Sequence, residues 1–138
     1  MLRDLRALVM ISAALCLAQA REARAQSDLR SFFTDSQSVR GQQWFEATCL
    51  SCHPTRDMTS ADFKLRWNGR TALELYERIS TTMPQAEPGS LSRRAYADVV
   101  AYLLRINGLA AGTVPLTTDS VTLVSFRLAF PPHTSAPR

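Results

Sequence analysis

The sequence predicts a small all-α domain, and three features of its 138 residues support this class. Apolar side chains recur at helical spacing from about Ser38, from near Thr71 and again from Ser92 to Asn107. The pattern Thr71-x-x-Glu74 is a capping box, which marks the start of a helix. No strong hairpin pattern interrupts this order. Hydrophobic residues make up 46% of the chain and charged residues 20%, a balance typical of a folded domain rather than a disordered chain.

The first helix is expected to run from about Ser38 into the sequence "CLSCH". Gly41, Phe45 and Cys49 recur every four residues, so they share one face of this helix. Gly41 would let another backbone approach closely. We therefore expect this helix to cross the last one, with Gly41 and Phe45 against Val99 and Tyr102.

The later helices are marked by apolar faces and by their ends. The helix near Thr71 has an apolar side formed by Leu75, Tyr76 and Ile79. The last helix begins near Ser92, and Asn107-Gly108 forms its stop signal. Its buried stripe is expected to contain Tyr96, Val99, Val100, Leu103 and Ile106. A shorter helix is expected from Ala61 to Trp67, after Ser60.

The first 25 residues have the layout of a cleaved secretory signal. Arg3 and Arg6 precede an apolar run over residues 7–18, which is too short to span a bilayer. Small residues two apart then form cleavage sites, the second ending at Ala25. Export to the periplasm is therefore expected, with no membrane span after cleavage. A retained membrane anchor is the alternative.

Cleavage changes both the charge and the cysteine content. Losing residues 1–25 takes four arginines and two acids from 16 basic and 12 acidic residues, which leaves a net charge of +2. A nearly neutral chain gives no electrostatic support for binding nucleic acid. Cys16 is lost as well, so Cys49 and Cys52 remain. We expect a leader over 26–37, the helical domain over 38–108 and an irregular extension over 109–138.

The sequence "CLSCH" at residues 49–53 has four interpretations. A disulfide between Cys49 and Cys52 would close a very small loop, so it would add little stability. A thioredoxin-like redox pair needs a preceding strand, and none is predicted. A structural zinc site normally needs four ligands, and the only other histidine is His133 in a proline-rich tail. The fourth interpretation, which the pattern C-x-x-C-H favours, is covalent attachment of a c-type haem.

In the haem interpretation each residue of the motif has a role. The thiols of Cys49 and Cys52 form thioethers with the two vinyl groups, and His53 is thereby placed beneath the iron as a ligand. Haem is attached after export, which agrees with the predicted signal.

Met83 is the candidate for the other axial ligand. Two of the four methionines leave with the signal, and Met58 lies only five residues past the motif. Met83 is followed by Pro84, which favours extended backbone at Met83, and then by a Pro88-Gly89 turn signal. Such a stiff loop would hold a thioether in a fixed place. The alternative role of Met83 is apolar filling of the core.

Residues 39–108 resemble a class I cytochrome c. The resemblance rests on three motifs, Gly41-x-x-x-Phe45-x-x-x-Cys49-x-x-Cys52-His53, Met83-Pro84 and "YADVVAYLL". It implies a helical shell around one covalent haem c, and single-electron transfer rather than catalysis. It also implies that Cys49 and Cys52 carry the thioethers and that His53 and Met83 ligate the iron.

Residues 66–112 are similar to cytochrome domains associated with pyrroloquinoline-quinone dehydrogenases. The shared features are the Met-Pro loop, the following Pro-Gly-Ser-Leu, and a Tyr-Ala-Asp helix ending in Asn-Gly. This similarity implies a dehydrogenase as electron donor, and an oxidase or another cytochrome as acceptor. Pro54 departs from the pattern, because many relatives have glycine after the histidine, so the path of this loop is open.

Two further sets of residues carry weaker expectations. Arg66, Trp67 and Arg70 are candidate donors to the haem propionates, with a solvated surface as the alternative for the two arginines. Residues 121–130 are apolar and partly alternating, so we expect a short strand or an extended arm. This segment is expected either to pack over the core or to dock a partner. His133 is expected to be an exposed bystander.

Two other functional classes remain open. A haem-based gas sensor or a peroxidase-like enzyme would have Met83 unbound or easily displaced. A haem-free binding or redox domain would use Cys49 and Cys52 as a disulfide.

Overall fold

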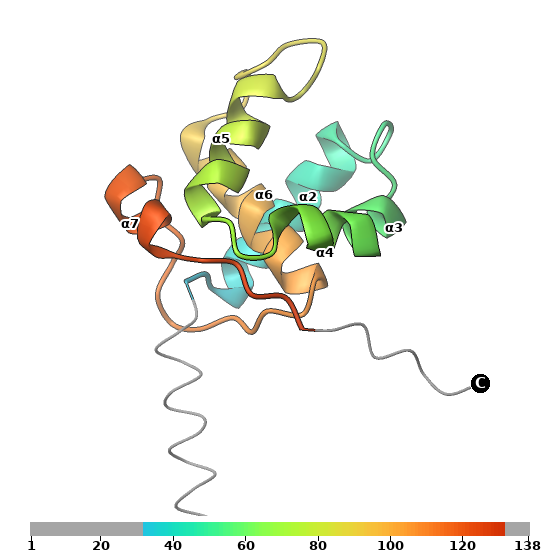
Figure 1. The fold of residues 1–138 in the computed structure, drawn as a ribbon. Helices are drawn as coiled ribbons and strands as arrows, with labels where there is room; N and C mark the ends of the chain where they lie inside the picture. The colour runs from blue at the N-terminus through green and yellow to red at the C-terminus, as the bar shows by residue number, and fades with distance from the viewer. Residues whose placement is uncertain (1–31, 132–138) are drawn as a thin grey trace, which may run out of the picture. The chain divides into compact units, whose positions relative to one another are not determined.

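The computed structural model describes residues 32–131, and within them the chain forms six α-helices and no strand (Figure 1). This confirms the predicted all-α class. No helix in this range is both long and apolar enough to cross a bilayer. The predicted signal over 1–25, Cys16 and His133 lie outside the described residues. The helices are α2 (Asp35–Thr48), α3 (Thr55–Met58), α4 (Ala61–Trp67), α5 (Ala72–Thr82), α6 (Arg93–Ile106) and α7 (Ser120–Ser125).

The helices α2 and α6 cross with their backbones in close contact at Gly41. A β-carbon added at Gly41 would lie 1.8 Å from the backbone oxygen of Asp98, so only glycine fits there. The rings of Phe45 and Tyr102 pack beside this point with their centroids 5.3 Å apart. Val99 belongs to the same buried cluster. The predicted contact of these two helices is confirmed.

A partly buried ion pair fixes this crossing. The guanidinium of Arg40 donates to both carboxylate oxygens of Asp98, at 2.8 and 3.0 Å. Asp98 is 2% exposed, so its charge needs this partner. The hydrogen bond to Asp98 also raises the pKa of Arg40. The two-pronged geometry restricts both sliding and rotation of α2 against α6.

Capping residues set the helix starts. At α5 the N–H of Glu74 donates to the Thr71 hydroxyl at 3.2 Å, and the N–H of Thr71 donates to the Glu74 carboxylate at 2.8 Å. This is the predicted capping box. Ser92 caps α6 and Ser60 caps α4, as expected. The first helix begins at Asp35, earlier than predicted, because Thr34 and Gln37 form a second capping box.

The helix α3 was not predicted. It is a single turn that follows Pro54, whose φ is −54°. Proline fixes φ near this helical value and is favoured where a helix begins. Many relatives have glycine at this position. With Pro54 there instead, the chain after His53 enters a short helix directly.

The prediction of a strand or an extended arm is wrong for Ser120–Ser125, which form α7. The Asp119 carboxylate caps this helix by accepting from the N–H of Thr122 at 2.8 Å. Residues 126–130 lie outside any helix, in agreement with the expected extended arm. This segment runs beside the loop that precedes α5. The N–H of Ala72 donates to the Phe126 carbonyl, and the N–H of Gly69 donates to the Leu128 carbonyl, both at 2.8 Å.

The C-terminal extension is part of the hydrophobic core. Leu116, Leu123, Phe126 and Leu128 are buried in the same cluster as the inner faces of α5 and α6. Gln37 ties the extension to α2, because its side-chain amide donates to the Leu116 carbonyl at 2.9 Å and accepts from the Leu116 N–H at 2.7 Å. The expected packing over the core is confirmed, and the core reaches beyond residues 38–108.

We predict that Gly41→Ala destabilises the protein by about 1–3 kcal/mol, because the methyl group forces α2 away from α6. Denaturant unfolding of the purified protein measures this. Gln43→Ala changes an exposed residue of the same helix and should shift stability by no more than about 0.5 kcal/mol. Equal stabilities of the two variants would contradict the close approach.

Candidate functional site

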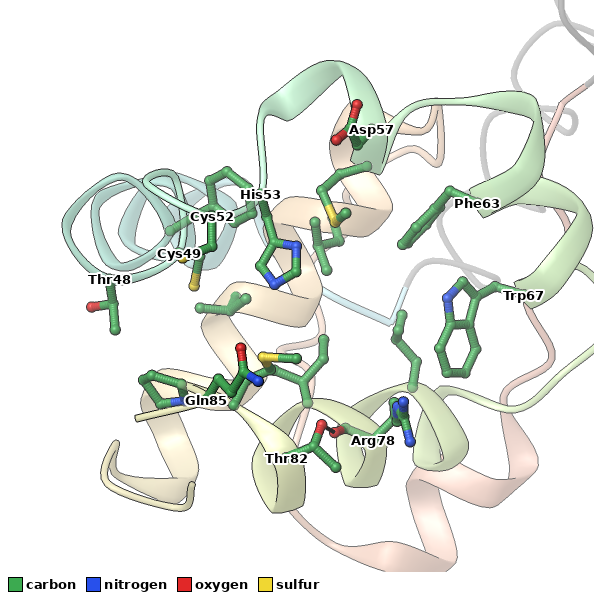
Figure 2. Close-up of a pocket in the computed structure, with 18 of the residues that line it drawn as sticks. Thr48, Cys49, Cys52, His53, Asp57, Phe63, Trp67, Arg78, Thr82 and Gln85 are labelled. Carbon is green, nitrogen blue, oxygen red and sulfur yellow. Dashed lines mark hydrogen bonds between the residues drawn. The ribbon is translucent and has the colours of Figure 1, made fainter. Parts of the chain in front are cut away.

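A cavity of about 950 Å³ lies between α2, the segment after it, α4, α5 and α6 (Figure 2). This is near the upper end of the volumes of small-molecule sites, in a domain of only about 100 described residues. Its walls are mainly apolar. The apolar lining residues include Phe45, Met58, Phe63, Trp67, Leu75, Ile79, Val99 and Leu103.

The C-x-x-C-H motif forms one wall of this cavity. The α2 helix ends at Cys49, whose N–H still donates to the Phe45 carbonyl at 2.8 Å. The Cys49 carbonyl then accepts from the N–H groups of Cys52 and His53, at 3.1 and 2.9 Å. This turn places both thiols and the imidazole beside one another, and Figure 2 shows the His53 ring pointing into the cavity.

The two thiols differ in their surroundings. Cys49 is half-buried and Cys52 is exposed, and both are free thiols. Burial raises the pKa of the Cys49 thiol. Within residues 32–131 no three His, Cys, Asp or Glu side chains are grouped so as to hold a metal ion.

Met83 reaches the same cavity from the end of α5. Its N–H donates to the Ile79 carbonyl at 2.9 Å, and its backbone is then extended, with φ −128° and ψ 152°. This is the conformation predicted from the following proline. All four predicted site residues therefore line one cavity. Met58 lines it too, so the cavity contains a second thioether.

Two of the three residues predicted to donate to the haem carboxylates lie at the cavity. Arg66 and Trp67 line the cavity, whereas Arg70 does not. The guanidinium of Arg70 instead lies over the Trp67 ring, 5.6 Å from its centroid, and 3.6 Å from the Glu74 carboxylate.

Arg78 also lines the cavity (Figure 2). It was not predicted from the sequence as a site residue. The available signal was its spacing, since it lies three residues after Leu75 on the same helix. Leu75, Arg78, Ile79 and Thr82 follow the i, i+3, i+4, i+7 spacing of one helix face, and all four line the cavity.

The residues present fit a covalently held haem. Two free thiols and an imidazole stand on one wall, and a thioether enters from a different element. The apolar walls suit a macrocycle. Arg66, Arg78 and the indole N–H of Trp67 can serve its carboxylates.

One comparison with known proteins gives a match. The family model described as cytochrome c oxidase, cbb3-type, subunit III, matches residues 37–103. A search of curated proteins and a search of solved structures each returned no match. The match covers the motif, Met83 and most of α6, and it supports a c-type cytochrome. A domain of this type holds a covalently bound haem c with its iron.

We predict that Arg78→Gln lowers the reduction potential, because removing a positive charge at the cavity favours the more positive, oxidised iron. A charge about 10 Å away, at an effective dielectric constant of roughly 20 to 80, gives a shift of roughly 20–70 mV. A potentiometric titration measures it.

Arg105→Gln is the matched control for this titration. Arg105 does not line the cavity, and it is half-exposed and paired with Asp35 at 3.1 Å. Its replacement should shift the potential by less than about 10 mV, because Arg105 lies outside the cavity lining and solvent screens its charge. Equal shifts in the two variants would rule out a specific effect of Arg78.

Proposed function

We propose that this c-type cytochrome domain is a single-electron carrier in which Cys49 and Cys52 anchor the haem and His53 and Met83 ligate its iron. The observation that carries this proposal is the convergence of these four side chains on one apolar cavity. They come from two distant parts of the sequence, the end of α2 and the end of α5.

The haem, when bound, supplies a one-electron couple between ferric and ferrous iron. The protein's part is to hold it and to tune it. A neutral thioether opposite an imidazole favours the reduced state and so raises the potential. If His53 and Met83 both held the iron, no position would be left open for oxygen or peroxide. Such a site would suit electron transfer rather than catalysis.

The cavity walls support the same role. Phe45, Val99 and Leu103 keep one side of the cavity apolar, which lowers the local dielectric and adds to the tuning. Arg66, Arg78 and Trp67 supply polar groups on the α4 and α5 side, where carboxylates would need donors. The side chains thus divide between apolar groups for the macrocycle and a few placed donors for its charged edge.

We further propose that the carrier works in the periplasm, after export through a cleaved signal. A quinoprotein dehydrogenase is the proposed donor, supported by the similarity of residues 66–112 to the cytochrome domains of such systems. An oxidase or another cytochrome is the proposed acceptor. The matched family model is described as an oxidase subunit, which supports a respiratory chain as the destination of the electrons. A nearly neutral protein suits a small and transient docking contact.

Expression with the native signal, in cells that contain haem-attachment machinery, tests the core of the proposal. The exported protein should be coloured, and its intact mass should exceed that of the cleaved chain by one haem. Cys49→Ser with Cys52→Ser should abolish the covalent haem. A colourless exported protein with the mass of the bare chain would instead indicate a haem-free redox domain.

A second experiment tests the partner. Stopped-flow mixing of the oxidised protein with a reduced quinoprotein dehydrogenase should give rapid haem reduction. A reduced dehydrogenase of another cofactor class serves as the comparison. If only the dehydrogenase of the other cofactor class reduces the haem, the quinoprotein assignment is wrong. The proposed role as an electron carrier would remain.

We predict that Met83→Ala abolishes the far-red sulfur-to-iron absorption band, lowers the potential by on the order of 0.1 V and allows prompt binding of carbon monoxide to the reduced protein. Visible spectroscopy and potentiometry measure these changes.

Met58→Ala is the control, because Met58 also lines the cavity. It should keep the band and the slow reaction with carbon monoxide. If the band disappears in the Met58 variant instead, the ligand assignment is wrong. Prompt carbon monoxide binding by the unaltered protein would favour a gas sensor or a peroxidase-like enzyme.

A further inference from the structure

The hydroxyl of Tyr96 holds the loop that carries Met83. Tyr96 lies on α6 and is 3% exposed. Its hydroxyl donates to the Met83 carbonyl at 2.7 Å and accepts from the N–H of Leu91 at 3.3 Å. One phenol therefore joins the first and last residues of the segment 83–91.

The backbone of Met83 is restrained on both sides. Its N–H is bound to the last turn of α5, through the Ile79 carbonyl. Its carbonyl accepts from Tyr96 and also from the N–H of Gly89, at 3.3 Å. The direct contact with Tyr96 is the shortest of these, and it is the one that ties the loop to another helix.

This contact links the two halves of the site. The α6 helix is fixed against α2 at Gly41 and by the pair of Arg40 with Asp98. The α2 helix ends in the C-x-x-C-H motif. A chain of contacts thus runs from the turn with His53, through α2 and α6, to the backbone of Met83.

We propose that Tyr96 is a positioning residue that keeps the Met83 thioether on the iron against competing ligands. The proposal rests on the proposed ligation by Met83. Displacing the thioether requires the 83–91 loop to move, and the Tyr96 hydrogen bonds oppose that movement. Tyr96 does not line the cavity, so it acts through the backbone of Met83 and not through contact with a ligand.

Titration of the oxidised, haem-loaded protein with imidazole tests this proposal, using loss of the far-red band as the signal. Tyr96→Phe keeps the ring and removes the hydroxyl. Because one hydrogen bond in a protein typically changes an equilibrium by about three- to tenfold, imidazole should bind this variant about three- to tenfold more tightly. Denaturant unfolding of the same samples measures any general loss of stability.

Tyr76→Phe is the matched control. Tyr76 is also buried, and its hydroxyl donates to the Arg93 carbonyl at the start of α6, at 3.4 Å. The Tyr76→Phe substitution removes a buried phenol hydroxyl whose hydrogen bond is to Arg93 and not to Met83. Imidazole affinity should stay within about twofold of that of the unaltered protein.

The outcomes separate this inference from the proposed function. Tighter imidazole binding only in Tyr96→Phe supports the positioning role. If the unaltered protein shows the far-red band and the two variants bind imidazole alike, Tyr96 has only a structural role and the inference fails. If the unaltered protein shows no far-red band and Met83→Ala leaves its spectrum unchanged, the ligation itself fails and the inference falls with it.

Discussion

The contact between α2 and α6 is the constraint on which the site depends. The absence of a side chain at Gly41 lets the two backbones meet, and the Arg40–Asp98 pair fixes their relative rotation. The motif follows directly at the C-terminus of α2, so its place is set by this contact. Because α6 also carries Tyr96, the same helix governs the loop of Met83. One helix pair thereby sets the positions of both walls of the cavity.

The apolar residues fall into two clusters with different tasks. The larger cluster joins the inner faces of α5 and α6 to α7 and the extended tail. The smaller one contains Phe45, Val99, Tyr102 and Leu103, and three of these four line the cavity. A short domain that leaves so much of its interior for a cofactor has little apolar surface left to bury against itself. The extension after residue 108 supplies Leu116, Leu123, Phe126 and Leu128, which explains why it packs into the core instead of trailing away.

Local signals predicted most of the helices, and non-local packing decided what they missed. Capping residues gave the starts of α4, α5 and α6 because a cap depends only on neighbours in the sequence. The segment after Asp119 was misread because its apolar residues alternate in part, while its buried residue, Leu123, packs into a cluster with the distant helices α5 and α6. Arg78 was missed because a cation on a helix usually faces solvent. Its spacing from Leu75 was the available signal, but spacing alone does not distinguish a helix face at a cavity from one at the solvent.

The geometry also bears on why Met83, and not Met58, is the proposed ligand. Met58 ends the single turn of α3, directly after the motif, and its carbonyl accepts from the Asn107 side chain at 2.8 Å. Its position therefore follows from the same segment that presents His53, with too little chain between them to reach around a macrocycle. Met83 is separated from the motif by α4 and α5, and so it can approach independently. Ligands on opposite faces of one flat group need this independence. Under the proposed ligation a second element would bring the sulfur to the iron, and α5, whose end is tied to α6 through Tyr96, reaches the cavity at Met83.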